Sequence, residues 1–279
     1  MSDARPNAPH PQPRGVYIHG TEPEEQDRLR TLNRLTNRSF LEFLHLSPGV
    51  SVLEVGSGLG LLAADVAAAV PGGRVVGLEA AWEQVARAPA GIPMLWFVTG
   101  DAHAMPCRSG VFDVVYCRYV LEHVADPPGV LREIRRVLKP GGEVFIQENN
   151  ILVNDFDPAC PAFDHVWQCF ARLQERLGGD ARIGKKLFRL LQFEGFEGIR
   201  LSIAPEVHHA GDEAFRPWVE NLIGNVRSAE RALIAGRLVT EREISLAYGE
   251  LEQLLQRSDA SAYFYWNRAR ASRPPTSGA

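Results

Sequence analysis

Three glycines at alternate positions follow a short apolar run in the stretch VLEVGSGLG, residues 52–60. Glycine has no side chain and accepts positive φ, so such a turn lets the backbone approach a bound ligand closely. A dinucleotide-binding G-x-G-x-x-G turn would need its third glycine at position 61, but the chain has Leu61 there. The spacing therefore argues against a cradle for a pyrophosphate. The loop glycines are Gly56, Gly58 and Gly60.

Two carboxylates downstream of the glycines point to a nucleoside. Glu79 closes a second apolar run about twenty residues further on, where its carboxylate can accept hydrogen bonds from both ribose hydroxyls. Asp101 follows a third apolar run in Gly100-Asp101-Ala102, and can accept a hydrogen bond from an adenine amino group while a neighbouring amide donates to the ring. Together these residues predict a site for an adenosine-containing ligand.

The elements that must position these residues are short apolar runs alternating with helical stretches. Strands that are apolar throughout and separated by helices pair in parallel, with both sheet faces covered. We therefore predict a doubly wound α/β sheet. The expected strands are 51–55, 74–79, 95–99, 113–117 and 143–148, and the expected helices are 61–70, 82–88 and 129–138.

The rest of the chain predicts a helical lid and a late completion of the sheet. Apolar residues at helical spacing predict one or two helices over 24–46, introduced by a capping box from Thr21 to Glu24. Further helices are expected over 183–193 and 212–256. Two more strands are expected over 198–204 and 262–269. The predicted organisation is a flexible tail (1–20), an N-terminal helical lid (21–48), the ligand-binding core (49–149), helical substrate-lid insertions (150–182 and 205–258), completion of the core sheet (183–204 and 259–270) and a flexible tail (271–279).

The composition limits the class of protein. With 279 residues, 45% hydrophobic and 23% charged, the chain can bury one large core or one core with a smaller lid. A net charge of -4 disfavours nucleic acid as a partner. The four cysteines lack CxxC spacing, so we expect neither a disulfide framework nor a metal site. No signal peptide or membrane-spanning run is evident, which predicts a cytoplasmic protein without membrane contact.

Five sequence blocks, in order, resemble the class I S-adenosylmethionine-dependent methyltransferases, in the small-molecule (methyltransferase type 11/25-like) branch. These blocks are VLEVGSGLG, VVGLEA, GDAHAMP, FDVVYCRYVLEHVADP and LKPGGEVFIQE. The resemblance implies a Rossmann-like fold with a seven-stranded, mostly parallel sheet. It also implies S-adenosyl-L-methionine as the cofactor and S-adenosyl-L-homocysteine as the product.

By this resemblance, each block has a part in binding the cofactor. Glu54 and the three loop glycines shape the site of the methionine part, Glu79 takes the ribose, and Asp101 with Ala102 takes the adenine. Cys117 and Arg118 lie beside the sulfonium. A weaker similarity of YIHG (17–20) to an N-terminal lid adds Tyr17. The remaining expected contacts are Ser57, Ala80, Trp82 and Gly100.

Methyl transfer needs positioning and, when the acceptor loses a proton, a general base. Glu148, at the end of a predicted strand, and His123, in LEHVADP, are the catalytic candidates. Glu122 and Asn149 are neighbouring alternatives, Asn149 only as an orienting group. The other histidines considered are His165, His208 and His209.

The acceptor is expected to be a small, partly apolar metabolite methylated on O, N or C. Six aromatic residues could wall its pocket, but core packing of the lid is the better explanation for most of them, and only one or two rings are expected to touch the substrate. Two alternatives stay open: a non-catalytic S-adenosylmethionine-binding protein of the same fold, and an NAD-dependent oxidoreductase. The amphipathic helices could bury a homodimer interface or pack on the chain's own sheet. The six aromatic residues are Phe156, Phe163, Trp167, Phe170, Phe215 and Trp218.

Overall fold

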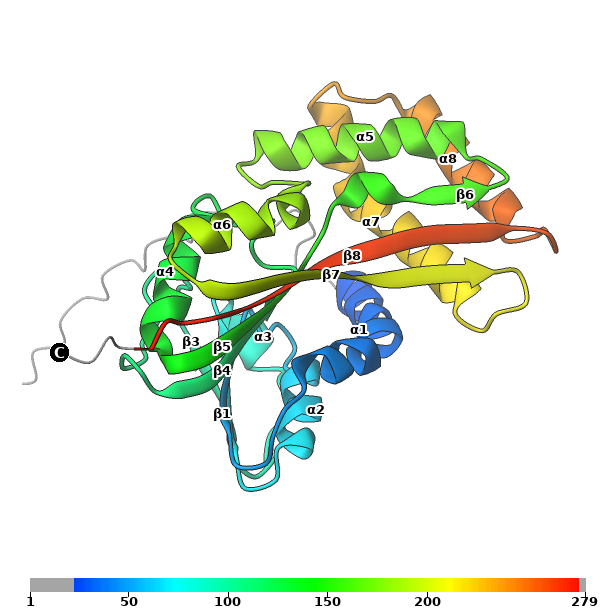
Figure 1. The fold of residues 1–279 in the computed structure, drawn as a ribbon. Coiled ribbons are helices and arrows are strands. Elements are labelled where there is room, and N and C mark those ends of the chain that lie inside the picture. The colour runs from blue at the N-terminus through cyan, green and yellow to red at the C-terminus, as the bar shows by residue number, and fades with distance from the viewer. Residues whose placement is uncertain (1–22, 276–279) are drawn as a thin grey trace, which may run out of the picture.

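Five strands pair in parallel at the centre of the computed structural model, which describes residues 23–275 (Figure 1). Their order in the sheet is β3-β2-β1-β4-β5. All five residues of β1 are buried, as expected for a strand covered on both faces. The predicted doubly wound α/β sheet is confirmed. The strands are β1 (Ser51–Val55), β2 (Arg74–Glu79), β3 (Leu95–Thr99), β4 (Phe112–Arg118) and β5 (Leu138–Glu148).

Three antiparallel strands complete the eight-stranded sheet. One half of β8 (Ser261–Ser272) pairs with β5, and its other end pairs with the short β6 (Asp155–Asp157). On its other side β8 pairs with β7 (Glu197–His209) along nearly its whole length. Both long strands exceed the predicted ranges, because their ladder continues past the core and under the lid (Figure 1).

Helices cover both faces of the core sheet. On one face α1 and α2 bury apolar side chains such as Phe40 and Val66 against the strands. On the other face α4 and α6 do the same with Ile134 and Leu191. The predicted cap residue Thr21 lies outside the described residues. These helices are α1 (Pro23–Leu44), α2 (Leu61–Ala69), α4 (Pro127–Val137) and α6 (Leu187–Phe193), with a short α3 (Trp82–Val85) after β2.

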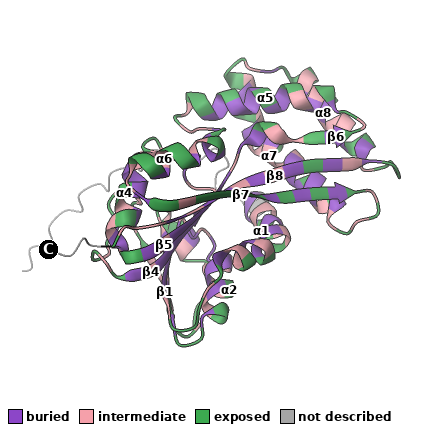
Figure 2. Ribbon diagram, in the orientation of Figure 1, coloured by how far each residue is buried: buried purple, intermediate pink, exposed green. Residues whose placement is uncertain are grey.

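A third apolar cluster lies between the long strands and the lid helices. Phe163, Trp167 and Phe170 recur at helical spacing on α5, and all three are buried. Figure 2 shows buried purple segments on the lid helices and on β8. The lid thus has its own core, which continues from the sheet. Its helices are α5 (Pro161–Arg176), α7 (Phe215–Ala235) and α8 (Glu241–Leu254), and two short 3₁₀ turns, η1 (Ile151–Val153) and η2 (Ile183–Lys186), join lid and core.

Candidate active site

A cavity of about 430 Å³ lies where the core sheet meets the lid. Its core side is formed by the residues that follow β1, β2 and β4, and its lid side by α1, α5, α7 and β8. The strand order reverses between β1 and β4, and ligands of open α/β sheets bind at this point beyond the carboxyl ends of the strands. The cavity is therefore the candidate active site.

The glycine loop serves both packing and binding. Gly60 has φ +70°, and a Cβ there would lie 2.3 Å from the Phe97 ring, so this glycine lets β3 approach the loop. Gly58 has φ +51°, lines the cavity, and a Cβ there would meet no atom within 4 Å. Gly58 therefore leaves backbone exposed to a ligand, whereas Gly60 does not line the cavity.

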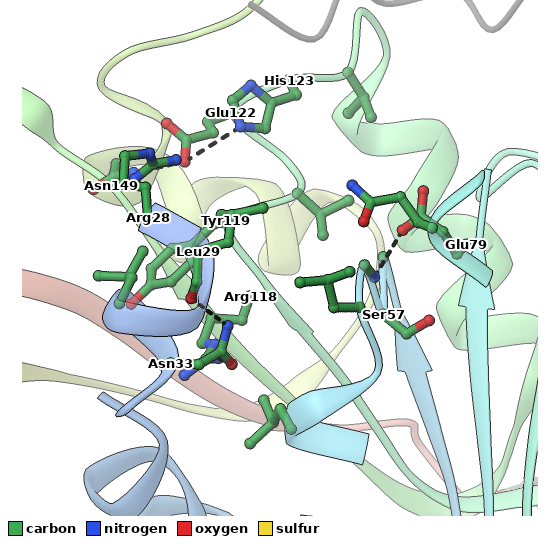
Figure 3. A pocket seen from close by; sticks show the side chains of 18 of the residues that line it. Arg28, Leu29, Asn33, Ser57, Glu79, Arg118, Tyr119, Glu122, His123 and Asn149 are labelled. Atoms are coloured by element: carbon green, nitrogen blue, oxygen red, sulfur yellow. Dashed lines mark hydrogen bonds and ion pairs between the residues drawn. The ribbon is translucent and has the colours of Figure 1, made fainter. Parts of the chain in front are cut away.

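Glu79 lies at the cavity wall and holds the glycine loop. Its Oε2 accepts a hydrogen bond from the Gly58 amide at 2.9 Å, and its Oε1 accepts one from the Ala81 amide at 2.9 Å (Figure 3). On the neighbouring loop Asp101 Oδ1 accepts a bond from the His103 amide at 2.8 Å. Both predicted carboxylates thus lie at the cavity, together with Ala80, Gly100 and Ala102.

Three buried polar atoms beside the glycine loop have no hydrogen-bond partner within residues 23–275. They are Glu54 Oε2, Ser57 Oγ and Gln84 Oε1, and all three residues line the cavity. Burial raises the pKa of Glu54 to about 8, and the nearby Arg118 opposes this shift. A ligand with an ammonium group and hydroxyls would satisfy these atoms, as the methionine and ribose parts of S-adenosylmethionine do. The residues present therefore fit this cofactor.

The remaining predicted cofactor contacts are placed differently. Arg118 lines the cavity, but its guanidinium donates to Asn33 and Asn37 Oδ1 at 2.8 Å each and so ties the end of β4 to α1 (Figure 3). Cys117 is buried in the sheet, outside the cavity. Trp82 is 64% exposed and does not line the cavity either. Tyr17 lies outside the described residues.

Aromatic side chains dominate the lid half of the cavity. Trp167 and Phe170 stack with ring centroids 5.0 Å apart, and Tyr119 lies 4.4 Å from Trp266. Trp218 and Phe264 also line this half. Of the six aromatic residues singled out in the sequence, Phe156, Phe163 and Phe215 belong to the lid core instead.

Glu122 and His123 lie at the cavity wall in the loop after β4 (Figure 3). The Glu122 carboxylate accepts hydrogen bonds from Asn149 Nδ2 at 2.6 Å and Gln174 Nε2 at 3.1 Å, and its Oε1 is 3.8 Å from His123 Nε2. Burial lowers the pKa of His123, and the neighbouring Glu122 partly opposes this shift. The imidazole is therefore neutral at pH 7 and able to accept a proton.

Glu148 is fully buried and does not line the cavity. Its Oε1 accepts hydrogen bonds from the Val120 and Leu121 amides at 2.9 and 2.8 Å. Burial, and then the charge of Glu122, raises the pKa of Glu148 well above its usual range. Glu148 thus anchors the loop that carries Glu122 and His123.

The three other histidines considered in the sequence do not line the cavity. His165 pairs with Glu243 and His209 with Asp212 on the surface, whereas His208 is buried beside Glu206. All four cysteines are free. Within the described part of the chain, no group of three His, Cys, Asp or Glu side chains could hold a metal ion. None of the described helices is long and apolar enough to cross a membrane.

Sequence reasoning missed several cavity residues on the lid. Gln174 and Asn154 occupy segments without a recognisable motif, and only the folded lid brings them to the cavity. Gln84 lies in the short α3, and its side chain is buried. The sequence does not single it out, because glutamine side chains are usually exposed.

The parallel sheet, the glycine loop and the carboxylate at the end of β2 match the Rossmann-like fold of the methyltransferases. Residues 53–146 match the Methyltransferase domain family. Over this region the chain is similar to the S-adenosylmethionine-dependent methyltransferases.

Known proteins resemble the chain over different lengths. An uncharacterized 37.1 kDa protein from transposon TN4556 of Streptomyces fradiae is 32% identical over 205 residues, covering 71% of this chain and 56% of that protein. A sterol 4-C-methyltransferase of Caenorhabditis elegans is 37% identical over 148 residues, covering 51% and 44%. The chain spans about half the length of these curated relatives.

A solved structure extends the likeness across the lid. A Bacillus halodurans protein assigned to the methyltransferases has a TM-score of 0.59 and 20% identity, and the match covers 86% of this chain and 99% of that one. At this identity the match concerns the fold alone.

Proposed function

We propose that this protein transfers a methyl group from S-adenosylmethionine to an oxygen or nitrogen atom of a small, mostly apolar metabolite. The observation that carries the proposal is one continuous cavity. It joins the glycine loop and its partnerless polar atoms to an aromatic chamber, and His123 with Glu122 lines the wall of that cavity.

The bound cofactor would supply an electrophilic methyl group on a sulfonium with an excellent leaving group. Glu79, Ser57 and the Gly58 backbone would hold its nucleoside and methionine parts, and the aromatic wall would hold the acceptor and exclude water. Such positioning accounts for much of the acceleration of a displacement reaction.

His123 is the proposed general base. In the tautomer with its proton on Nε2, 3.8 Å from Glu122 Oε1, the neutral imidazole would have a lone pair on Nδ1 to take a proton from the acceptor. Glu122 would then stabilise the imidazolium, while Asn149 and Gln174 hold its carboxylate in place. A base of this kind serves a hydroxyl or an amine, and therefore supports O- or N-methylation.

The apolar character of the acceptor is supported by the aromatic lining and by the relative that is named for its sterol substrate. Glu148, also a candidate base from the sequence, is proposed to act through the loop it anchors.

Two measurements test the proposal. The first is calorimetric titration with S-adenosylhomocysteine, with NAD as a parallel control, and we expect micromolar binding of the former alone. The second is a screen of phenols, amines and sterols with methyl-labelled S-adenosylmethionine. Label in an O- or N-methyl product supports the proposal. Binding without transfer to any acceptor would favour a non-catalytic protein, and NAD binding would overturn the assignment.

A further inference from the structure

Three polar atoms on the lid side of the cavity are buried without a hydrogen-bond partner in the described residues: Asn154 Oδ1, Gln174 Oε1 and Trp218 Nε1. The last two belong to the most deeply buried of these side chains, and they indicate what the acceptor must offer. Gln174 and Trp218 come from different helices, α5 and α7, and are 2% and 1% exposed. Both line the cavity, yet Gln174 Oε1 and Trp218 Nε1 have no hydrogen-bond partner within the described chain. A buried polar group without a partner is destabilising, so such atoms at a ligand cavity mark positions for the ligand's own polar groups.

The orientation of the Gln174 amide follows from its surroundings. Its Nε2 donates to the Glu122 backbone carbonyl at 3.2 Å and to Glu122 Oε2 at 3.1 Å. Turning the amide over would place its oxygen against these two acceptors, with no proton between them. Gln174 therefore presents an oxygen, which can only accept a hydrogen bond.

Trp218 presents the opposite polarity, because an indole nitrogen can only donate. Its ring is held by Trp266 at 6.1 Å, by Phe264 at 5.5 Å and by His208 at 5.3 Å between ring centroids. The indoles of the other two tryptophans that line the cavity already donate within the protein, Trp167 to the Ile151 carbonyl and Trp266 to Glu206. Trp218 is therefore the donor left for a ligand among these three.

We propose that the acceptor is a hydroxylated ring compound that also carries a carbonyl oxygen. A hydroxyl or amine N–H would donate to Gln174 Oε1, and the carbonyl would accept from Trp218 Nε1. Both groups would be set in an otherwise apolar ring system held by the aromatic wall. This inference rests on the proposed function, of which it names the substrate class.

The test compares two probes on two matched variants of the whole chain, each saturated with S-adenosylhomocysteine. The probes are 6-hydroxy-1,4-naphthoquinone, whose hydroxyl and carbonyl groups are too far apart to bond to each other, and 2-naphthol, which has only the hydroxyl. Trp218→Phe removes the free indole donor and keeps an aromatic ring. Trp167→Phe is the control, because its indole proton is already used inside the protein.

We expect the quinone to bind the unmodified protein at least tenfold more tightly than naphthol, as one hydrogen bond of about 1.5 kcal/mol implies. Trp218→Phe should abolish that preference, and Trp167→Phe should leave the ratio of the two affinities unchanged. Equal affinities in the unmodified protein, or equal loss of both probes in Trp218→Phe, would overturn the inference. The inference would also be overturned if only sterols without a carbonyl gave a labelled product, but that result would leave the proposed methyl transfer intact. Failure to bind S-adenosylhomocysteine would instead refute the proposed function itself.

Discussion

Glu148 offers a direct way to separate a catalytic base from a loop anchor. Its carboxyl group is buried, its pKa is raised well above the usual range, and its Oε1 accepts two backbone amides of the loop that carries Glu122 and His123. A protonated carboxyl and a carboxamide have nearly the same shape and both keep an acceptor oxygen. Glu148→Gln should therefore preserve the loop, and Glu148→Ala should release it.

The structure sets the size of the two effects. Alanine leaves the amides of Val120 and Leu121 without an acceptor, and each orphaned buried donor costs about 1–3 kcal/mol, so we expect a loss of about 2–6 kcal/mol in the free energy of unfolding. Glutamine avoids this loss. A carboxyl whose pKa is raised by folding contributes stability that is lost as the pH rises above 4.5, so Glu148→Gln should be at least as stable as the unmodified protein at pH 7.5.

Urea unfolding, calorimetry with S-adenosylhomocysteine and turnover of an acceptor found in the screen measure these effects. We expect Glu148→Gln to keep most of the turnover, since His123 remains in place. A general base contributes about 10²–10⁴-fold. If Glu148→Gln lost at least 100-fold in turnover while its stability and cofactor affinity stayed normal, the anchoring role would be refuted and Glu148 would be the base.

Three further variants test the rest of the site. Glu79→Ala should weaken S-adenosylhomocysteine binding at least tenfold by calorimetry, because it removes the proposed ribose acceptor and the carboxylate that holds Gly58. The control Glu83→Ala, at an exposed position of α3, should not change the affinity. His123→Asn should reduce kcat by about 10²–10⁴-fold and leave the cofactor affinity unchanged. It should also remove the fall in rate below pH 6.5 that protonation of His123 causes in the unmodified protein. An unaltered pH–rate profile would exclude His123 as the base. Folding raises the pKa of Glu54 from 4.5 to about 8, so its contribution to stability is present below pH 4.5 and is lost as the pH rises to 8. Glu54→Gln should therefore reduce the fall in the free energy of unfolding over this pH range by up to roughly 5 kcal/mol, measured by urea unfolding. An equal fall in both proteins would contradict the reasoning.

The core of the site could be predicted because its residues are close to regular elements. Glu79 ends one short apolar strand and Asp101 follows another, and parallel strands bring their carboxyl ends to one edge of the sheet. Local pattern was therefore enough to place both beside the glycine loop. Trp82 is only three residues beyond Glu79 and was expected to contact the cofactor for that reason. In the structure it begins α3, and its side chain is exposed to solvent.

The sequence by itself determined the doubly wound sheet and the glycine loop, since apolar periodicity and turn chemistry act over a few neighbouring residues. The class of cofactor followed from the resemblance of its five sequence blocks to the methyltransferases. Only the tertiary structure decided the roles of the buried polar groups. Glu148 and Glu122 are both carboxylates near the end of a strand, yet one is enclosed behind the loop and the other lines the cavity. Gln174 reaches Glu122 across 52 positions of the chain. Solvent exclusion and hydrogen-bond partners assembled over such separations determine what a side chain can do, and no local pattern records them.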